Sequence, residues 1–96
     1  MIYADFMKMD YEGRLMLVCI GTRNDLAAQN IVLEEGLNLV FYNHDEDNDG
    51  NRDDLVVEGV VTHDKENNRW VANIDWGAIK NISNLTTEEK QKMAIK

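Results

Sequence analysis

The feature that most constrains this chain is a hydrophobic side chain at every second position in three separate segments. Residues 37–42, 55–63 and 69–76 each place large apolar side chains on one side of an extended backbone. Successive side chains of a strand point to opposite faces, so this spacing predicts strands and not helices. The residues that share a face are Leu37, Leu39 and Phe41; Leu55, Val57, Val61 and His63; and Trp70, Ala72, Ile74 and Trp76.

The N-terminal part of the chain predicts a hairpin followed by a short helix. Residues 2–9 and 15–20 are rich in β-forming side chains and flank a turn that contains a glycine. Thr22, with Asp25 three residues later, resembles the capping box that begins a helix. About two helical turns then fit before Asn30, which is a suitable C-terminal stop.

The C-terminal part predicts a second hairpin, a last strand and a terminal segment. Residues 64–68 are polar and include two asparagines, so they join the last two of the alternating segments in a hairpin. Gly59, within a strand, indicates a bulge or a close approach of another segment. A final strand is predicted at 80–83. We expect one domain at 1–83 and a short helix or frayed tail at 84–96.

The order of these elements carries a resemblance. It is similar to the SH3-like small barrel, which has a sharp acidic-glycine turn such as the one at 33–36. Segments 59–61 and 69–76 also resemble the later hairpin of small uncharacterised bacterial proteins, in which a stretch like 21–26 and an acidic loop occur in the same order. The similarity spans roughly residues 1–83. It implies an all-β, β-dominated SH3-like barrel with an N-terminal hairpin and one or two short helices, and no established activity.

Acidic side chains are concentrated in one segment of a chain whose net charge is −8. Residues 45–54 contain six carboxylates against one arginine. Such a surface repels phosphate backbones and attracts basic proteins, so we expect a basic protein partner and no nucleic acid. A nucleic-acid-binding barrel is the second alternative, and it requires four cations to cluster: Lys8, Arg14, Arg23 and Lys80.

The same acidic segment contains a pattern that suits calcium. Carboxylates at alternate positions followed by a glycine can surround Ca²⁺ within a tight turn, and the candidate ligands in loop 45–53 are Asp45, Asp47, Asp49 and Asp53. An EF-hand would require an apolar residue at Arg52 and a glutamate at Val56, so only a loop of another kind fits. We weigh this first alternative against a solvated loop, which we favour.

Cysteine and serine usage excludes the usual catalytic and zinc patterns. Cys19 is the only cysteine and lies in a six-residue apolar run, far short of the ~20 residues that span a bilayer. Ser83 is the only serine and has no glycine elbow, and His44 and His63 are distant from each other. We therefore expect no enzyme activity, no cofactor other than calcium, no membrane partner and a cytoplasmic location.

Five aromatic residues have two interpretations: Tyr3, Phe6, Tyr42, Trp70 and Trp76. Barrels of this class can form an aromatic cage for methylated lysine or arginine, but alternation of the kind seen in residues 70–76 more often fills a core, which we favour. The specific function cannot be derived from the sequence, and a small protein-interaction module is the preferred prediction. Its expected interaction surface consists of Tyr42, Glu46, Asp54 and Trp76.

Overall fold

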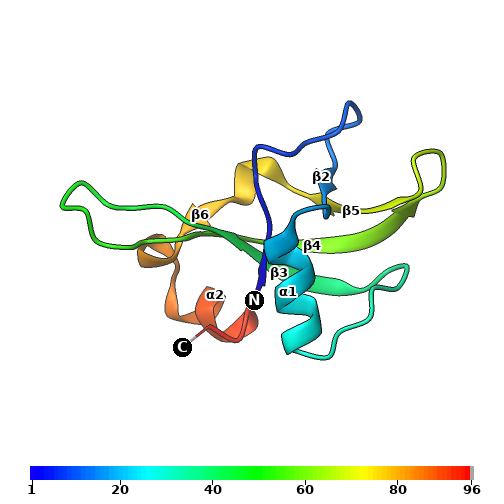
Figure 1. Cartoon of the computed structure of the whole chain (residues 1–96). Helices are drawn as coiled ribbons and strands as arrows, with labels where there is room; N and C mark the ends of the chain where they lie inside the picture. The colour runs from blue at the N-terminus through cyan, green and yellow to red at the C-terminus, as the bar shows by residue number, and fades with distance from the viewer. Residues whose placement is uncertain (96) are drawn as a thin grey trace.

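The computed structural model describes residues 1–95 and contains 33% strand against 22% helix. The sheet curls into half of a barrel, with two short helices packed outside it (Figure 1). The prediction of a β-dominated fold is therefore confirmed. The elements are β1 (Ile2–Tyr3), β2 (Leu15–Met16), α1 (Ile20–Ala28), β3 (Asn38–Asn43), β4 (Leu55–Asp64), β5 (Arg69–Ile74), η1 (Trp76–Ala78), β6 (Lys80–Asn81), η2 (Ile82–Asn84) and α2 (Thr87–Lys92).

One long strand, β4, organises the sheet. It pairs antiparallel with β3 on one side and with β5 on the other, and its first two residues pair with β6. The strand order is β1-β3-β4-β5-β2, with β6 added beside β4. The alternating segments of the sequence thus form the three central strands.

The apolar face of these strands encloses the core. Phe41, Val57, Val61 and Ala72 are buried, and Trp70, Ile74 and Trp76 pack against them. Gly59 lies where β3 and β5 both approach β4, and a Cβ atom there would lie 2.7 Å from Ile74 Cγ2 and 3.0 Å from Phe41 Cε2. The predicted close approach at Gly59 is confirmed.

The prediction of an N-terminal hairpin is wrong for most of its length. β1 pairs in parallel with β3, in the register Ile2 with Phe41 and Tyr3 with Tyr42, and only a bridge between Met9 and Leu15 resembles the predicted hairpin. Local sequence favoured pairing across the nearest turn, but Ile2 and Ala4 bury their side chains against the core when they lie beside β3.

The first helix also begins earlier than predicted. Cys19 is the N-cap residue, and Ile20, expected at the end of a buried strand, starts α1 and is exposed. Thr22 does not cap the helix; its buried hydroxyl donates a 2.6 Å hydrogen bond to the Tyr3 carbonyl. The hydroxyl therefore joins α1 to β1. Asn30 follows the helix with a φ of 55°, as a stop residue should.

The C-terminal predictions agree more closely with the structure. The 64–68 turn contains Asn68 at a φ of 48°, and β4 and β5 form the predicted hairpin around it. The expected strand at 80–83 is shorter, because η2 replaces its second half. Thr86 caps α2 through a capping box with Glu89. Within residues 1–95, no helix combines the length and the hydrophobicity needed to cross a bilayer.

Candidate functional site at the base of an acidic arm

The segment between β3 and β4, residues 44–54, projects from the sheet and is called here the acidic arm (Figure 1). It continues the hairpin, since Glu46 bridges to Arg52. At its tip one carboxylate oxygen, Asp47 Oδ1, accepts hydrogen bonds of 2.9 Å from the amides of Asp49 and Asn51. These donors lower the pKa of the Asp47 carboxyl. The arm is therefore an ordered turn, because five of its amides donate hydrogen bonds to acceptors within it.

The base of the arm is attached to β6 and η2. Asn81 Nδ2 donates to Asp45 Oδ2 at 2.8 Å and to the Asp53 carbonyl at 2.7 Å. The Asp53 carboxylate accepts from the Ser83 amide at 3.0 Å and from the Ser83 hydroxyl at 2.5 Å. These four bonds fix the direction in which the arm projects.

The four predicted calcium ligands have different roles in the structure. Asp45, Asp47 and Asp53 already accept hydrogen bonds from protein donors, and Asp49 lies at the exposed tip. Across the part of the chain that the structure describes, no group of three or more His, Cys, Asp or Glu side chains is placed to bind a metal ion. The alternating carboxylates organise the loop, and calcium binding stays a prediction.

A buried carboxylate lies beneath the base of the arm. Asp54 is 6% exposed, and Arg52 Nε lies 3.0 Å from both of its oxygens. His44 Nδ1 lies 3.5 Å from Asp54 Oδ1. Burial raises the pKa of the Asp54 carboxyl, but Arg52 and His44 together outweigh this effect and leave the pKa below its ordinary value. Asp54 therefore positions Arg52 and His44 and is not itself a contact surface.

Three aromatic rings, those of Tyr3, Tyr42 and His44, gather next to this carboxylate and are called here the aromatic cluster. Their centroids lie 5.6 Å (Tyr3 to Tyr42), 5.5 Å (Tyr3 to His44) and 5.7 Å (Tyr42 to His44) apart. Because successive side chains of a strand alternate between its two faces, Tyr42 and His44 lie on the same side of the chain, opposite the buried Phe41. The parallel register of β1 then places Tyr3 beside Tyr42.

A surface concavity of about 350 Å³ opens over the aromatic cluster. One wall is the start of α1, whose Gly21 allows close packing: a Cβ atom there would lie 2.6 Å from Tyr3 Cδ1. Asp25, also on α1, accepts a 2.8 Å hydrogen bond from the Tyr3 amide. Burial, followed by the negative charge of Asp25 and a hydrogen bond to it, raises the pKa of the Tyr42 hydroxyl. The lining residues are Tyr3, Gly21, Asn24, Asp25, Tyr42 and His44.

The predicted interaction residues are divided by the structure. Tyr42 is half-buried in the aromatic cluster, and Glu46 is exposed on the acidic arm. Trp76 packs against the core, and its indole Nε1 donates a 2.7 Å hydrogen bond to the Gly13 carbonyl. Its indole nitrogen is thereby used to join η1 to the 10–14 turn.

The sequence interpretation counted Tyr3 and Tyr42 among the candidate cage aromatics, but it did not identify His44 and Asp25 as members of the site. The spacing Tyr42-x-His44 was the available signal, because it places both rings on one face of a strand. No local signal placed Tyr3 beside Tyr42 or identified Asp25, since they reach the site through β1 pairing and through α1.

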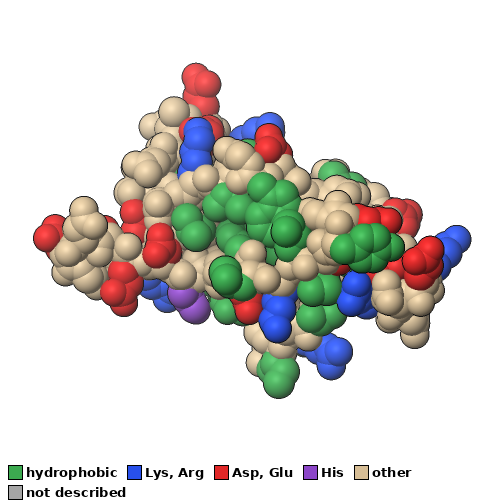
Figure 2. Space-filling view, turned by 90° about the horizontal axis from the view of Figure 1, so that it is seen from above, with side chains coloured by type: hydrophobic (Ala, Val, Ile, Leu, Met, Phe, Trp, Pro, Cys, Tyr) green, Lys and Arg blue, Asp and Glu red, His purple; other side chains and the backbone are tan. Residues whose placement is uncertain are grey.

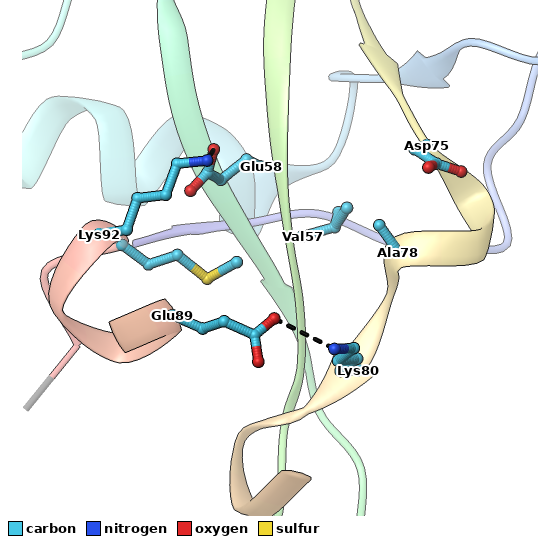
Figure 3. Close-up of a pocket in the computed structure, with 8 residues that line it drawn as sticks. Val57, Glu58, Asp75, Ala78, Lys80, Glu89 and Lys92 are labelled. Atoms are coloured by element: carbon cyan, nitrogen blue, oxygen red, sulfur yellow. Dashed lines mark hydrogen bonds and ion pairs between the residues drawn. The ribbon is translucent and has the colours of Figure 1, made fainter. Parts of the chain in front are cut away.

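A second hollow, of about 310 Å³, lies between the sheet and α2 (Figure 3). Val57 and Ala78 line it, and four of its five charged side chains form two pairs: Lys80 Nζ lies 3.1 Å from Glu89 Oε2, and Lys92 Nζ lies 3.9 Å from Glu58 Oε2. These pairs attach α2 to β4 and β6, so this hollow belongs to helix packing.

The cations required for nucleic-acid binding are partly neutralised by neighbours. Arg14 pairs with Asp10, Glu12 and Asp64, and Lys80 pairs with Glu89. A phosphate backbone would therefore meet carboxylates beside these two cations.

Comparisons with protein-family models, with curated proteins and with solved structures found no significant match to this chain. The resemblance to a bacterial SH3-like family therefore stays a prediction.

Proposed function

We propose that this chain is a non-catalytic protein-interaction module that binds a basic protein partner through its acidic arm. The observation that carries the proposal is that the arm is ordered while its outward carboxylates are unused. Among residues 1–95, Glu46 and Asp49 accept no side-chain hydrogen bond and form no ion pair, and both are exposed. A preorganised surface loses little conformational entropy on binding, because its loop is already ordered.

The shape and charge of the molecule support the same proposal. Its principal extents are 42 × 26 × 23 Å, and the arm forms one end of it (Figure 1). On the face shown in Figure 2, that end carries mostly carboxylates, whereas the opposite end carries both signs of charge. Clustered charge of one sign speeds association with a partner of the opposite sign and limits the choice of partner.

The fold assigned to this module is the SH3-like barrel. The half-barrel sheet, the turn at 33–36 with Gly36 at a φ of 83°, and the single turn η1 before β6 support the assignment. The cytoplasmic location and the bacterial family predicted from the sequence belong to the same proposal.

The experiment compares three forms of the chain as baits in quantitative affinity purification. The arm variant, Glu46→Gln with Asp49→Asn, removes two exposed carboxylates that form no side-chain hydrogen bond or ion pair among the described residues. Its matched control, Glu34→Gln with Glu66→Gln, removes one exposed carboxylate from each of the turns at 33–36 and 64–68. These turns lie toward the end of the molecule opposite the arm (Figure 1). We expect a basic protein that is retained by the wild type and the control and is depleted several-fold from the arm variant.

The purified partner is then titrated against each form at two salt concentrations. Wild-type affinity should fall with added salt more steeply than that of the arm variant, because fewer charges face the partner in the variant. Equal retention by all three baits, or equal loss from both double variants, contradicts binding through the arm.

A further inference from the structure

We propose that the aromatic cluster with Asp25 is a binding site for one cationic side chain, a lysine or an arginine, of the protein partner. The inference rests on the proposed function, because the side chain is taken to come from the partner that the acidic arm attracts. Neither tyrosine belongs to the hydrophobic core, since both rings lie on the outer side of β1 and β3.

The geometry supplies aromatic surface on an open face. The side chain of His44 is 58% exposed, and Tyr3 and Tyr42 are half-buried. The edge-to-face contacts of Tyr42 with Tyr3 and with His44 hold its ring at a steep angle, 79° and 74°, to its neighbours. An ammonium or guanidinium group within about 6 Å of a ring centroid is attracted by the ring quadrupole. The concavity over the cluster leaves space for such a group.

The charges around the concavity favour a cation over a neutral side chain. Asp25 lines it, and Asp45 and Glu46 lie beyond His44, where they line an adjoining hollow. Two arginines lie near the site. Arg52 is one of them, and its guanidinium is paired with Asp54 at 3.0 Å. Arg23 is exposed on α1, next to Asn24 in the chain. The carboxylates near the site outnumber these cations.

Hydrogen bonds hold the site in place before a ligand arrives. Asn43 Nδ2 donates to the Tyr3 hydroxyl at 3.2 Å, and Asp25 accepts from the Tyr3 amide. Gly21 contacts the Tyr3 ring so closely that any larger residue at position 21 would displace it. A rigid site loses little conformational entropy on binding, which compensates for its small area.

The test uses small soluble probes and the full chain labelled with ¹⁵N. The probes are the N-acetyl methylamides of lysine, trimethyllysine, arginine and norleucine. Amide shifts are recorded during titration of each probe. We expect the three cations to perturb the amides of Tyr3, Gly21, Asn24, Tyr42 and His44, with dissociation constants on the order of millimolar, and the neutral norleucine probe to leave them unchanged.

Trimethyllysine separates ring attraction from simple ion pairing, because its quaternary nitrogen has no proton to donate to a carboxylate. Its binding should persist at the level of lysine or above. Loss of binding on methylation would show that carboxylates alone attract the probes, and would overturn the aromatic site. Equal shifts with norleucine would overturn it as well.

Variants assign the effect to the rings. Tyr42→Leu should weaken binding of the cationic probes roughly two- to thirty-fold, the range of a cation–π contact, whereas Tyr42→Phe should retain it. The matched control is Tyr11→Leu, because Tyr11 is 81% exposed on the 10–14 turn and lines no part of the concavity. His44→Ala is the second test if Tyr42→Leu does not fold. Equal weakening by Tyr11→Leu overturns the site.

Failure of the aromatic site and failure of partner binding through the acidic arm give different experimental results. If the probes do not bind while a partner is lost from the arm variant, the arm binds the partner and the aromatic site is wrong. If the probes bind at the cluster but no partner depends on Glu46 and Asp49, the proposed function is wrong, and so is the assignment of the cation to that partner.

Discussion

Two antiparallel hairpins share β4, and they use aspartate in opposite ways. At the short 64–68 hairpin, Asp64 is 5% exposed, and its carboxylate faces Asn67, Arg14 and Arg69. At the tip of the acidic arm, Asp47 accepts only amides of its own loop, and Asp49 points into water. The cations that the tertiary structure brings nearby thus decide whether an aspartate supports the fold or remains available to a partner.

The two hairpins also differ in how they are attached to the rest of the molecule. Arg14 lies between Asp64 Oδ2 at 3.6 Å and Asp10 Oδ2 at 2.9 Å, so the short hairpin is connected to the N-terminal turn. The arm is attached at its base by Asn81 and Ser83, while its tip extends beyond these contacts. The short hairpin therefore belongs to the body of the domain, and the arm tip is free to act as a surface.

The largest effect is expected where both hairpins depend on the same residue. Gly59→Val places new atoms within 2.7 Å of Ile74 and 3.0 Å of Phe41, so β3 and β5 cannot both keep their distance from β4. We expect the free energy of unfolding to fall by about 2–3 kcal/mol, as for other overpacked cores. Urea denaturation followed by circular dichroism measures this change.

The control is the neighbouring position on the opposite face. Val60 is 41% exposed, so Val60→Ile adds atoms to the same strand without meeting the core. Its effect should be within about 0.5 kcal/mol. If Gly59→Val were equally mild, the close approach of the three strands at Gly59 would be wrong.

A smaller effect is expected from removing the buried charge of the short hairpin. Asp64→Asn leaves Arg14 and Arg69 facing a neutral amide in a largely buried position, and should lower the melting temperature by about 5–10 °C. The matched change in the arm, Asp49→Asn, should shift it by less than about 2 °C. Differential scanning calorimetry compares the two. Similar shifts would mean that the hairpins do not differ in the way described.

The same difference should appear as a dependence of stability on acid. Burial alone would raise the pKa of Asp10, but hydrogen bonds from Arg14 and from local amides outweigh it and lower this pKa below the ordinary 3.8. Hydrogen bonds from Asn67 lower the pKa of Asp64 below the same value. Because these folded-state values lie below the unfolded ones, their stabilisation is complete above the ordinary value and is lost as the pH falls through the lowered values. Below about pH 4, stability should therefore decline less steeply in Asp64→Asn than in the wild type. Parallel declines would contradict a lowered pKa at Asp64.

The smallest effect concerns calcium at the arm. Calcium at about 100 times the dissociation constant of a site would raise the free energy of unfolding by about 2.7 kcal/mol. Because Asp45, Asp47 and Asp53 already accept protein hydrogen bonds, we expect millimolar calcium to leave the melting temperature unchanged relative to a chelator. A calcium-dependent increase that Asp49→Asn abolishes would instead establish the site.

The acidic loop shows how far sequence reasoning reached. Asp, Asn and Gly at its tip indicated a turn, and a turn forms with Gly50 at a φ of 80°. Tyr42 and Glu46 were identified as surface residues, and both lie at or near the site. The partners of Asp54 could not be predicted, because a carboxylate beside an arginine in the sequence gives no information about burial.

The N-terminal segment shows where it failed. Residues 2–9 contain the side chains of a strand, but the partner of that strand was assigned to the nearest segment. Pairing with β3 requires contact across 39 residues, and no local pattern specifies such a contact. The position of Tyr3 beside Tyr42 and, through α1, the place of Asp25 at the site were missed for this reason.

Local alternation, turn residues and capping residues determined the three central strands, the 64–68 hairpin and α2, because these depend on neighbours within a few positions. The tertiary structure decided the parallel pairing of β1 with β3, the burial of Asp54 and Asp64, and the meeting of Tyr3, Tyr42 and His44. Each of these depends on contacts between residues distant in the chain, and such contacts form only when the whole core is buried together.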